Sequence, residues 1–132
     1  MKITADTNVL LRLVVPDDAA QQGVALETLK AAQSVAISTH SLCELAWVME
    51  RLYKAPRQDI AAAIRLFMNT GNVVLNRPAV EAGLAIFDAG GDFADGVIAF
   101  DGQWLGSETF VSFDKTAVRL LKSQGNAALL LK

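Results

Sequence analysis

Apolar residues recur along this chain in two alternating patterns. Short runs of three or four are typical of strands, and longer stretches spaced by three and four positions are typical of helices. The clearest helical stretch covers 39–53 and has apolar residues at Leu42, Leu45, Ala46, Met49 and Leu52. The same spacing predicts helices over 9–14, 20–29, 58–68, 78–89, 92–105 and 115–122. The short runs predict strands over 3–5, 35–37, 73–75, 109–112 and 128–131.

Strands separated by helices, with no hairpin turns between them, indicate an α/β fold with a mainly parallel central sheet flanked by helices on both faces. The chain has 132 residues, which is the length of one ordinary domain, so we expect a single domain over 1–132. In open parallel sheets the binding crevice lies beyond the carboxyl ends of the strands. That edge is where functional residues are expected.

Composition narrows the classes of protein and of metal site. No apolar stretch approaches the roughly 20 residues of a membrane span, and the N-terminus leads into a strand rather than a secretory signal. We therefore expect a cytoplasmic protein with no membrane association. Cys43 and His40 are each the only residue of their type, which excludes a disulfide framework and a zinc site of Cys and His ligands.

The net charge of −2 at first argues against a nucleic-acid partner, because such proteins usually carry a basic face. The chain has 12 Lys and Arg against 14 Asp and Glu; with four candidate site acids set aside, 12 basic residues face 10 acidic ones. The rest of the surface is then slightly basic, and RNA binding is not excluded.

Four of the acidic residues occupy equivalent places in the predicted fold. Asp6 and Asp114 follow strands directly, and Glu44 and Asp95 lie on the first turns of helices that follow strands or loops. A parallel sheet would bring all four to one edge. Like charges about 4 Å apart repel by roughly 4 kcal/mol at an effective dielectric near 20. A bound divalent cation is the simplest reason for such a cluster.

Each acid also has an ordinary structural explanation. Asp6 suits a turn or a helix cap, and Asp114 suits the cap of the last helix. Ser41 and Glu44 have the spacing of a capping box, in which the glutamate reaches back to the cap residue. Asp92 and Asp95 favour a helix N-terminus through its partial positive charge. Two further acids have no partner at a suitable spacing and are assigned to the surface, namely Asp88 and Asp101.

Four segments in order, MKITADTNVLLRLVV, ISTHSLCELAWVMERLY, GGDFADGVIA and FVSFDKTAVRLL, resemble the PIN-domain nucleases, and closer still the VapC toxins of bacterial type II toxin–antitoxin systems. The resemblance spans nearly the whole chain and implies a metal-dependent endoribonuclease. Two mild departures are Gly96, where alanine is common, and Ser112, where threonine is usual. The implied catalytic and metal-binding acids are Asp6, Glu44, Asp95 and Asp114, with Asp92 as a further acid at the rim.

Oxygen ligands without histidine or thiolate select Mg²⁺ or Mn²⁺. We expect Asp6 and Asp95 to anchor the ion, and Glu44 and Asp114 to hold waters or a second ion. A water activated by the metal would then hydrolyse an RNA phosphodiester. The residues expected to position the substrate or a carboxylate are Thr7, Asn8, Ser112 and Arg12.

Partners follow from the same resemblance, which implies a homodimer and a cognate VapB-like antitoxin that forms a hetero-oligomer with the toxin. The antitoxin's C-terminal segment is expected to place a basic side chain among the acids. The apolar content of 42–53 allows a helix-binding groove there. An open acidic crevice suits a flexible RNA loop, and transfer RNA is the family expectation. Trp47 and Trp104 suit either base stacking or a core or interface position.

Two other functions compete with this interpretation. A haloacid-dehalogenase-like phosphatase also has an aspartate after its first strand, but it needs a second aspartate two residues on, where this chain has Asn8. A catalytically silent PIN-like binding module would keep the acids only to receive a basic partner segment. Cleavage of RNA, hydrolysis of a phosphomonoester, or neither would separate the three.

Overall fold

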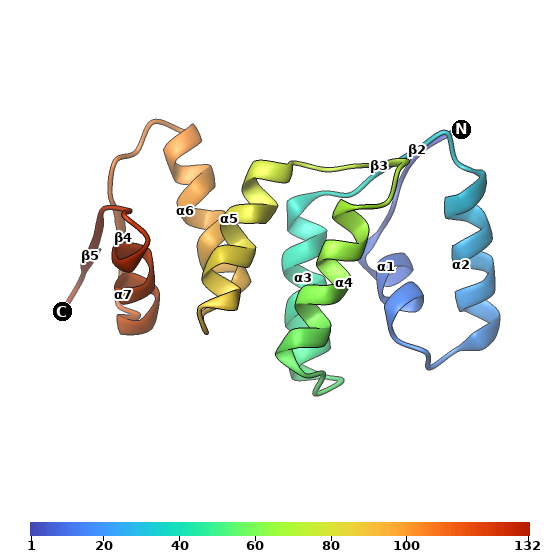
Figure 1. Cartoon of the computed structure of the whole chain (residues 1–132), viewed down its shortest axis with the longest axis horizontal. Coiled ribbons are helices and arrows are strands. Elements are labelled where there is room, and N and C mark those ends of the chain that lie inside the picture. The colour runs from blue at the N-terminus through green and yellow to red at the C-terminus, as the bar shows by residue number, and fades with distance from the viewer. The chain divides into compact units, whose positions relative to one another are not determined.

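The computed structural model describes residues 1–132, which form seven helices and five strands in two compact units, Met1–Asn76 and Arg77–Lys132. Figure 1 shows these elements along the chain. All strand pairs are parallel, so the predicted α/β class with parallel strands is confirmed. The expectation of one domain over the whole chain stays a prediction.

The first unit contains a three-stranded parallel sheet of β1 (Lys2–Thr4), β2 (Ser34–Ala36) and β3 (Val73–Val74), with β2 in the middle. Val35 pairs with Ile3 on one side and with Val73 on the other. Val35 is fully buried, as expected for a central strand of a parallel sheet. Beyond the last β1 residue, the Ala5 amide still donates to the Ala36 carbonyl at 3.0 Å, which leaves Asp6 at the end of the strand.

Four helices complete this unit, and their starts follow from capping residues. They are α1 (Thr7–Val14), α2 (Ala19–Ala31), α3 (Thr39–Arg51) and α4 (Arg57–Met68). Asp6, Asp18 and Ser38 cap the first three with side-chain oxygens, and Pro56 precedes the fourth. Helix α1 packs against α2 and α3, and α3 packs against α4 (Figure 1). The contacts bury Leu10, Leu42, Leu45, Ile60 and Ile64 completely.

The second unit consists of α5 (Arg77–Asp88), α6 (Phe93–Trp104), β4 (Phe110–Ser112), α7 (Lys115–Ser123) and β5 (Ala128–Leu130). Strands β4 and β5 form their own parallel pair, so hydrogen bonding divides the strands between two sheets, where the sequence predicted one central sheet. A cluster of Ile86, Leu120 and Leu121 forms the core between α5 and α7, with Ala99, Phe110 and Ala128 against it.

Helices α5 and α6 approach each other closely at two glycines. A Cβ atom added to Gly96 would lie 2.8 Å from the Cα of Gly83 and closer still to the Ala82 carbonyl oxygen. A Cβ on Gly83 would lie 2.7 Å from the ring of Phe93. The close approach of α5 and α6 therefore leaves no room for a Cβ atom at Gly96. This explains why glycine, and not the more common alanine, lies at this position in the first turn of α6.

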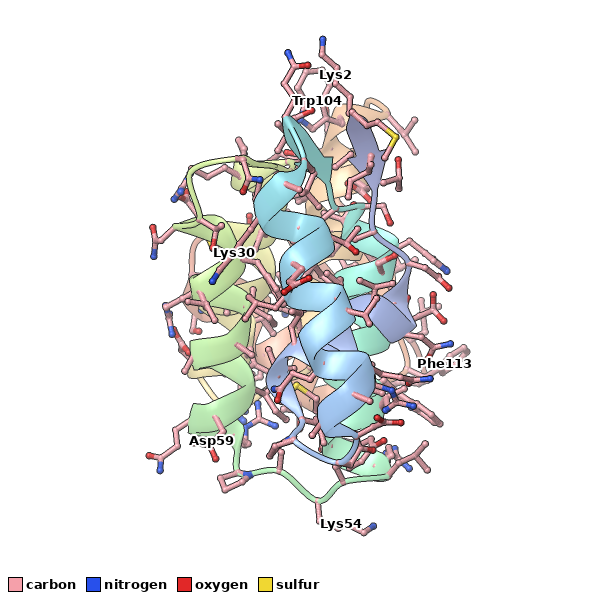
Figure 2. The ribbon with its side chains drawn as sticks, turned by 90° about the vertical axis from the view of Figure 1, so that its right-hand side faces the viewer. Lys2, Lys30, Lys54, Asp59, Trp104 and Phe113 are labelled. Atoms are coloured by element: carbon pink, nitrogen blue, oxygen red, sulfur yellow. The ribbon has the colours of Figure 1, made fainter.

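The predicted helices and strands agree with the observed ones to within a few residues. Residues with positive φ angles lie in turns that follow helices. Helix α6 ends before Gly106, whose φ of +96° lies in the left-handed region, as expected for a glycine that closes a helix. The loop between α3 and α4 carries Lys54 at its tip, with a φ of 53° (Figure 2). None of the seven helices has the length and apolar character needed to cross a membrane.

Candidate functional site: two groups of acidic side chains

The predicted site acids form two groups, one in each unit. The first group contains Asp6 and Glu44, and the second contains Asp92, Asp95 and Asp114. No three His, Cys, Asp or Glu side chains are arranged to hold a metal ion by themselves. The expectation that all of the acids act at one site stays a prediction.

In the first group, Asp6 has the capping role that its sequence context suggested. Its Oδ1 atom accepts a hydrogen bond from the Thr7 amide at 2.9 Å, and the residue lies at the N-cap of α1. The cap uses one carboxylate oxygen, and the side chain is exposed at the end of β1. Helix capping and a further role of the same carboxylate are therefore compatible.

Glu44 does not have the predicted capping role. The cap of α3 is Ser38, whose Oγ accepts from the Ser41 amide at 3.0 Å, so Glu44 lies in the second turn and not the first. The capping-box prediction was wrong because the helix begins two residues before Ser41. The Glu44 side chain instead accepts a hydrogen bond from Thr7 Oγ1 at 3.3 Å, which joins α3 to the residue beside Asp6.

A second partner of Glu44 was missed in the sequence. His40 Nε2 lies 3.1 Å from Glu44 Oε1, the same oxygen that Thr7 contacts. The two residues are four positions apart on α3, a spacing that places side chains on one helix face. The spacing of four residues is visible in the sequence. From the sequence, however, His40 was considered only as a possible zinc ligand.

In the second group, Asp92 and Asp114 are helix caps. Asp92 Oδ1 accepts from the Ala94 amide at 3.1 Å at the start of α6, and Asp114 Oδ1 accepts from Thr116 and Ala117 amides at 2.9 and 3.1 Å at the start of α7. Ser112 contributes to this corner, because its Oγ accepts from the Asp114 amide at 2.9 Å. Ser112 thus positions the loop that carries Asp114.

Asp95 has the most unusual electrostatic environment in the chain. Partial burial, followed by the charges of Asp92 and Asp114, raises its pKa from 3.8 to about 6. The structure therefore brings these three predicted acids close enough to interact. A carboxyl group whose ionisation is opposed by its neighbours is a common feature of functional sites.

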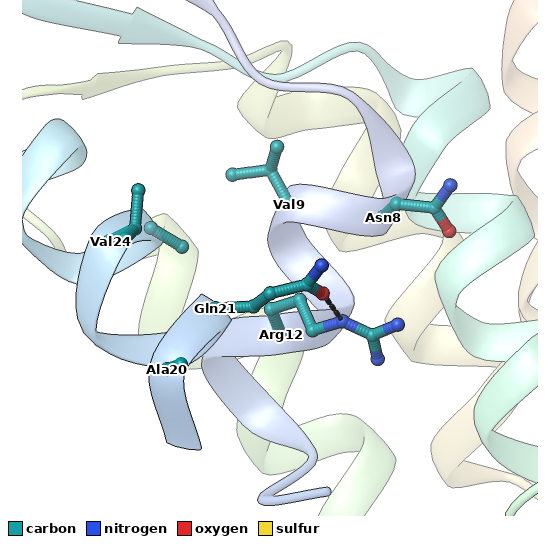
Figure 3. A pocket seen from close by; sticks show the side chains of 7 residues that line it. Asn8, Val9, Arg12, Ala20, Gln21 and Val24 are labelled. Carbon is teal, nitrogen blue, oxygen red and sulfur yellow. Dashed lines mark hydrogen bonds between the residues drawn. The ribbon is translucent and has the colours of Figure 1, made fainter. Parts of the chain in front are cut away.

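Arg12 and Asn8 lie beside a groove between α1 and α2. The groove has a volume of about 560 Å³ and is lined by Asn8, Val9, Arg12, Ala20, Gln21, Val24 and Ala25 (Figure 3). The Arg12 guanidinium pairs with Asp17 at 3.0 Å, and its Nε donates to Gln21. A hydrogen bond with Tyr53, followed by the nearby Asp17 charge, raises the pKa of Arg12 above its usual value. The expected phosphate contact of Arg12 stays a prediction.

Most apolar side chains of 42–53, where a helix-binding groove was predicted, are buried or partly buried inside the first unit. Leu42, Leu45 and Met49 are buried against neighbouring helices. The exceptions are Trp47 at 55% exposure, Leu52 at 67% and Tyr53 at 38%. The guanidinium of Arg51 lies 5.9 Å from the Trp47 ring centroid. Trp104 is also exposed, at 76%, so neither tryptophan is a core residue.

Comparisons with known proteins bear on the fold and the family. The Mycobacterium tuberculosis VapC20 toxin, described as cleaving the sarcin–ricin loop, has a solved structure that aligns with 99% of this chain and 100% of its own, at 16% identity and a TM-score of 0.45. A sequence comparison with curated proteins finds no significant match. Residues 3–120 match the PIN domain, a span that includes every acid described above. The chain therefore belongs to the PIN domain family.

Proposed function

We propose that this protein is a Mg²⁺- or Mn²⁺-dependent endoribonuclease and that it acts in the cytoplasm as the VapC-type toxin of a toxin–antitoxin pair. The observation that carries the proposal is the environment of Asp95, whose pKa is raised to about 6 beside Asp92 and Asp114 in a PIN-family chain. Ionising this group is unfavourable without a compensating positive charge. A divalent cation would supply that charge.

The side chains fit such a cation by their chemistry. Carboxylate oxygens are the preferred ligands of Mg²⁺ and Mn²⁺, and all five acids offer them. Mg²⁺ commonly takes only one or two carboxylates directly, and water or substrate phosphate completes its coordination. One or two of these acids would therefore be enough as direct ligands of Mg²⁺. We assign Asp6 and Asp95 as ligands, with Asp114, Glu44 and Asp92 as supporting acids.

A bound divalent cation activates water and stabilises negative charge on phosphoryl oxygens. The residues of the chain would perform the remaining tasks. Glu44 and Asp114 would accept hydrogen bonds from the attacking water or hold a second ion. Thr7 would fix the Glu44 carboxylate, Ser112 would fix the loop of Asp114, and Asn8 would hydrogen-bond a substrate phosphate.

The proposed substrate is a structured RNA such as transfer RNA, cut in an unpaired loop. Single-stranded segments can bend a phosphate into a site that a duplex cannot enter, and they can stack bases on exposed aromatic side chains. The exposed Trp47 with its neighbouring Arg51 is consistent with that type of contact. The proposed partners are a second copy of the chain and a VapB-like antitoxin whose basic side chain would neutralise the acids.

A titration of RNA cleavage with Mg²⁺ and Mn²⁺ tests the proposal. Wild type should cleave RNA only with one of these ions and should lose activity when a chelator removes it. Asp6→Asn, which keeps the size of the side chain, should reduce cleavage by at least about a hundredfold. Equal cleavage by wild type and variant, or none by wild type with either ion, would contradict the proposal. Hydrolysis of a simple phosphomonoester without RNA cleavage would indicate a phosphatase.

A further inference from the structure

Two side chains from different elements meet at one oxygen of Glu44. Thr7 Oγ1 at the start of α1 lies 3.3 Å from Oε1, and His40 Nε2 in the first turn of α3 lies 3.1 Å from the same atom. The second oxygen, Oε2, takes part in neither contact. This arrangement separates a held oxygen from one that can accept other hydrogen bonds or contact a cation.

Such an arrangement matters because Glu44 would otherwise be mobile. Its side chain is 52% exposed, and a glutamate has three rotatable bonds. Thr7 is nearly buried, at 9% exposure, so its hydroxyl is fixed by packing. A single bond to Thr7 leaves the carboxylate free to rotate about the contact. A second contact, from His40 one turn away on the same helix, restricts that freedom.

We propose that His40 is a positioning residue, which together with Thr7 orients Glu44 for RNA cleavage. The proposal rests on the proposed function, because it assigns His40 a role in that reaction through Glu44. His40 contacts Glu44 through Nε2, and its own side chain is 84% exposed, so it contributes little to packing. Its removal should affect the reaction and leave the fold intact.

Kinetics of purified full-length variants test the role. His40→Ala should lower kcat about tenfold, as is typical when a residue that orients a functional carboxylate is lost, with KM for RNA and the melting temperature unchanged. His40→Gln places an amide nitrogen on a side chain of similar reach, where it can contact the same Glu44 oxygen, and should restore most of kcat. In a Glu44→Ala background, His40→Ala should have no further effect, because the residue to be positioned is absent.

The single histidine allows a second readout that does not depend on activity. His40 supplies the only imidazole resonances of the protein in a nitrogen-correlated NMR spectrum. At one fixed pH, Glu44→Ala should shift these resonances, whereas Glu50→Ala, which removes another glutamate of α3, should leave them in place. Unchanged resonances in Glu44→Ala would overturn the proposal.

The outcomes separate this proposal from the proposed function. A wild type that cleaves no RNA with Mg²⁺ or Mn²⁺ would overturn the function. A wild type that cleaves, with a fully active His40→Ala variant, would overturn only the positioning role. A rise in KM at constant kcat would also overturn it, because that result indicates direct contact between His40 and RNA.

Discussion

At the residue scale, the acids combine structural and proposed chemical roles. Asp6, Asp92 and Asp114 each accept backbone hydrogen bonds at the start of a helix. The sequence context predicted the caps formed by Asp6 and Asp114, because short polar residues before an apolar helical run are typical of N-caps. The contact of Glu44 with Thr7 could not be predicted in the same way, because Thr7 is 37 residues away along the chain.

Asp6 offers a way to separate capping from catalysis. Asp6→Asn keeps an oxygen that can accept from the Thr7 amide, so the free energy of unfolding should change by less than about 0.5 kcal/mol. Asp6→Ala removes the cap and should lower it by about 1 kcal/mol. Both variants should lose RNA cleavage. Urea denaturation together with the cleavage assay measures the two effects, and a cleavage-competent Asp6→Ala would show that Asp6 is only a cap.

The raised pKa of Asp95 predicts that the free energy of unfolding depends on pH in a buffer without divalent cations. Its pKa in the folded protein is raised from 3.8 to about 6, so the protonated form favours folding. This contribution is complete below about pH 4 and is lost as the pH rises through about 6. The stability of Asp95→Asn relative to wild type should therefore rise between about pH 4 and about pH 6 and stay level at higher pH, a gain on the order of 1 kcal/mol because Asp95 is only partly buried.

Denaturant titrations of both proteins at several pH values measure this difference. Asp101→Asn, on an exposed residue of the same helix, serves as the control and should show no such trend. A difference between Asp95→Asn and wild type that is constant with pH would contradict the assigned electrostatic environment.

At the element scale, the helices and strands followed from the apolar pattern, but the contact between α5 and α6 did not. Periodicity identifies which face of a helix is buried and does not report how closely two helix axes approach. From the sequence alone, Gly96 is a helix residue of low propensity, which lowers helix stability by about 1 kcal/mol relative to alanine. The structure shows that the backbone of α5 occupies the space that a Cβ atom would need.

Gly96→Ala should therefore destabilise the protein despite its better helix propensity, by about 1 to 3 kcal/mol. Gly23→Ala in α2 is a suitable control, because a Cβ there has no atom within 4 Å. It should be neutral or stabilise by up to about 1 kcal/mol. Thermal or urea unfolding compares the two variants. Stabilisation by Gly96→Ala would show that α5 and α6 are farther apart than described.

At the scale of the whole molecule, the order of the elements predicted the α/β class, and the four motifs predicted the PIN family, which the match over residues 3–120 confirms. Strand directions were also predictable, since helices between successive strands imply parallel pairing. The division of the strands between two sheets was not, because strands of two or three residues carry too little pattern to fix their neighbours. The central claim that remains for experiment is that the predicted site acids bind a divalent cation.

Calorimetric titration with Mn²⁺ tests that claim most directly. Wild type, Asp6→Asn from the first unit, Asp95→Asn from the second and the exposed control Asp101→Asn would be compared at a pH above about 7, where Asp95 is ionised. We expect wild type and Asp101→Asn to bind Mn²⁺ equally, and each of the other two variants to bind at least about tenfold more weakly. Unchanged binding in either Asp6→Asn or Asp95→Asn would contradict the assignment of that residue as a cation ligand.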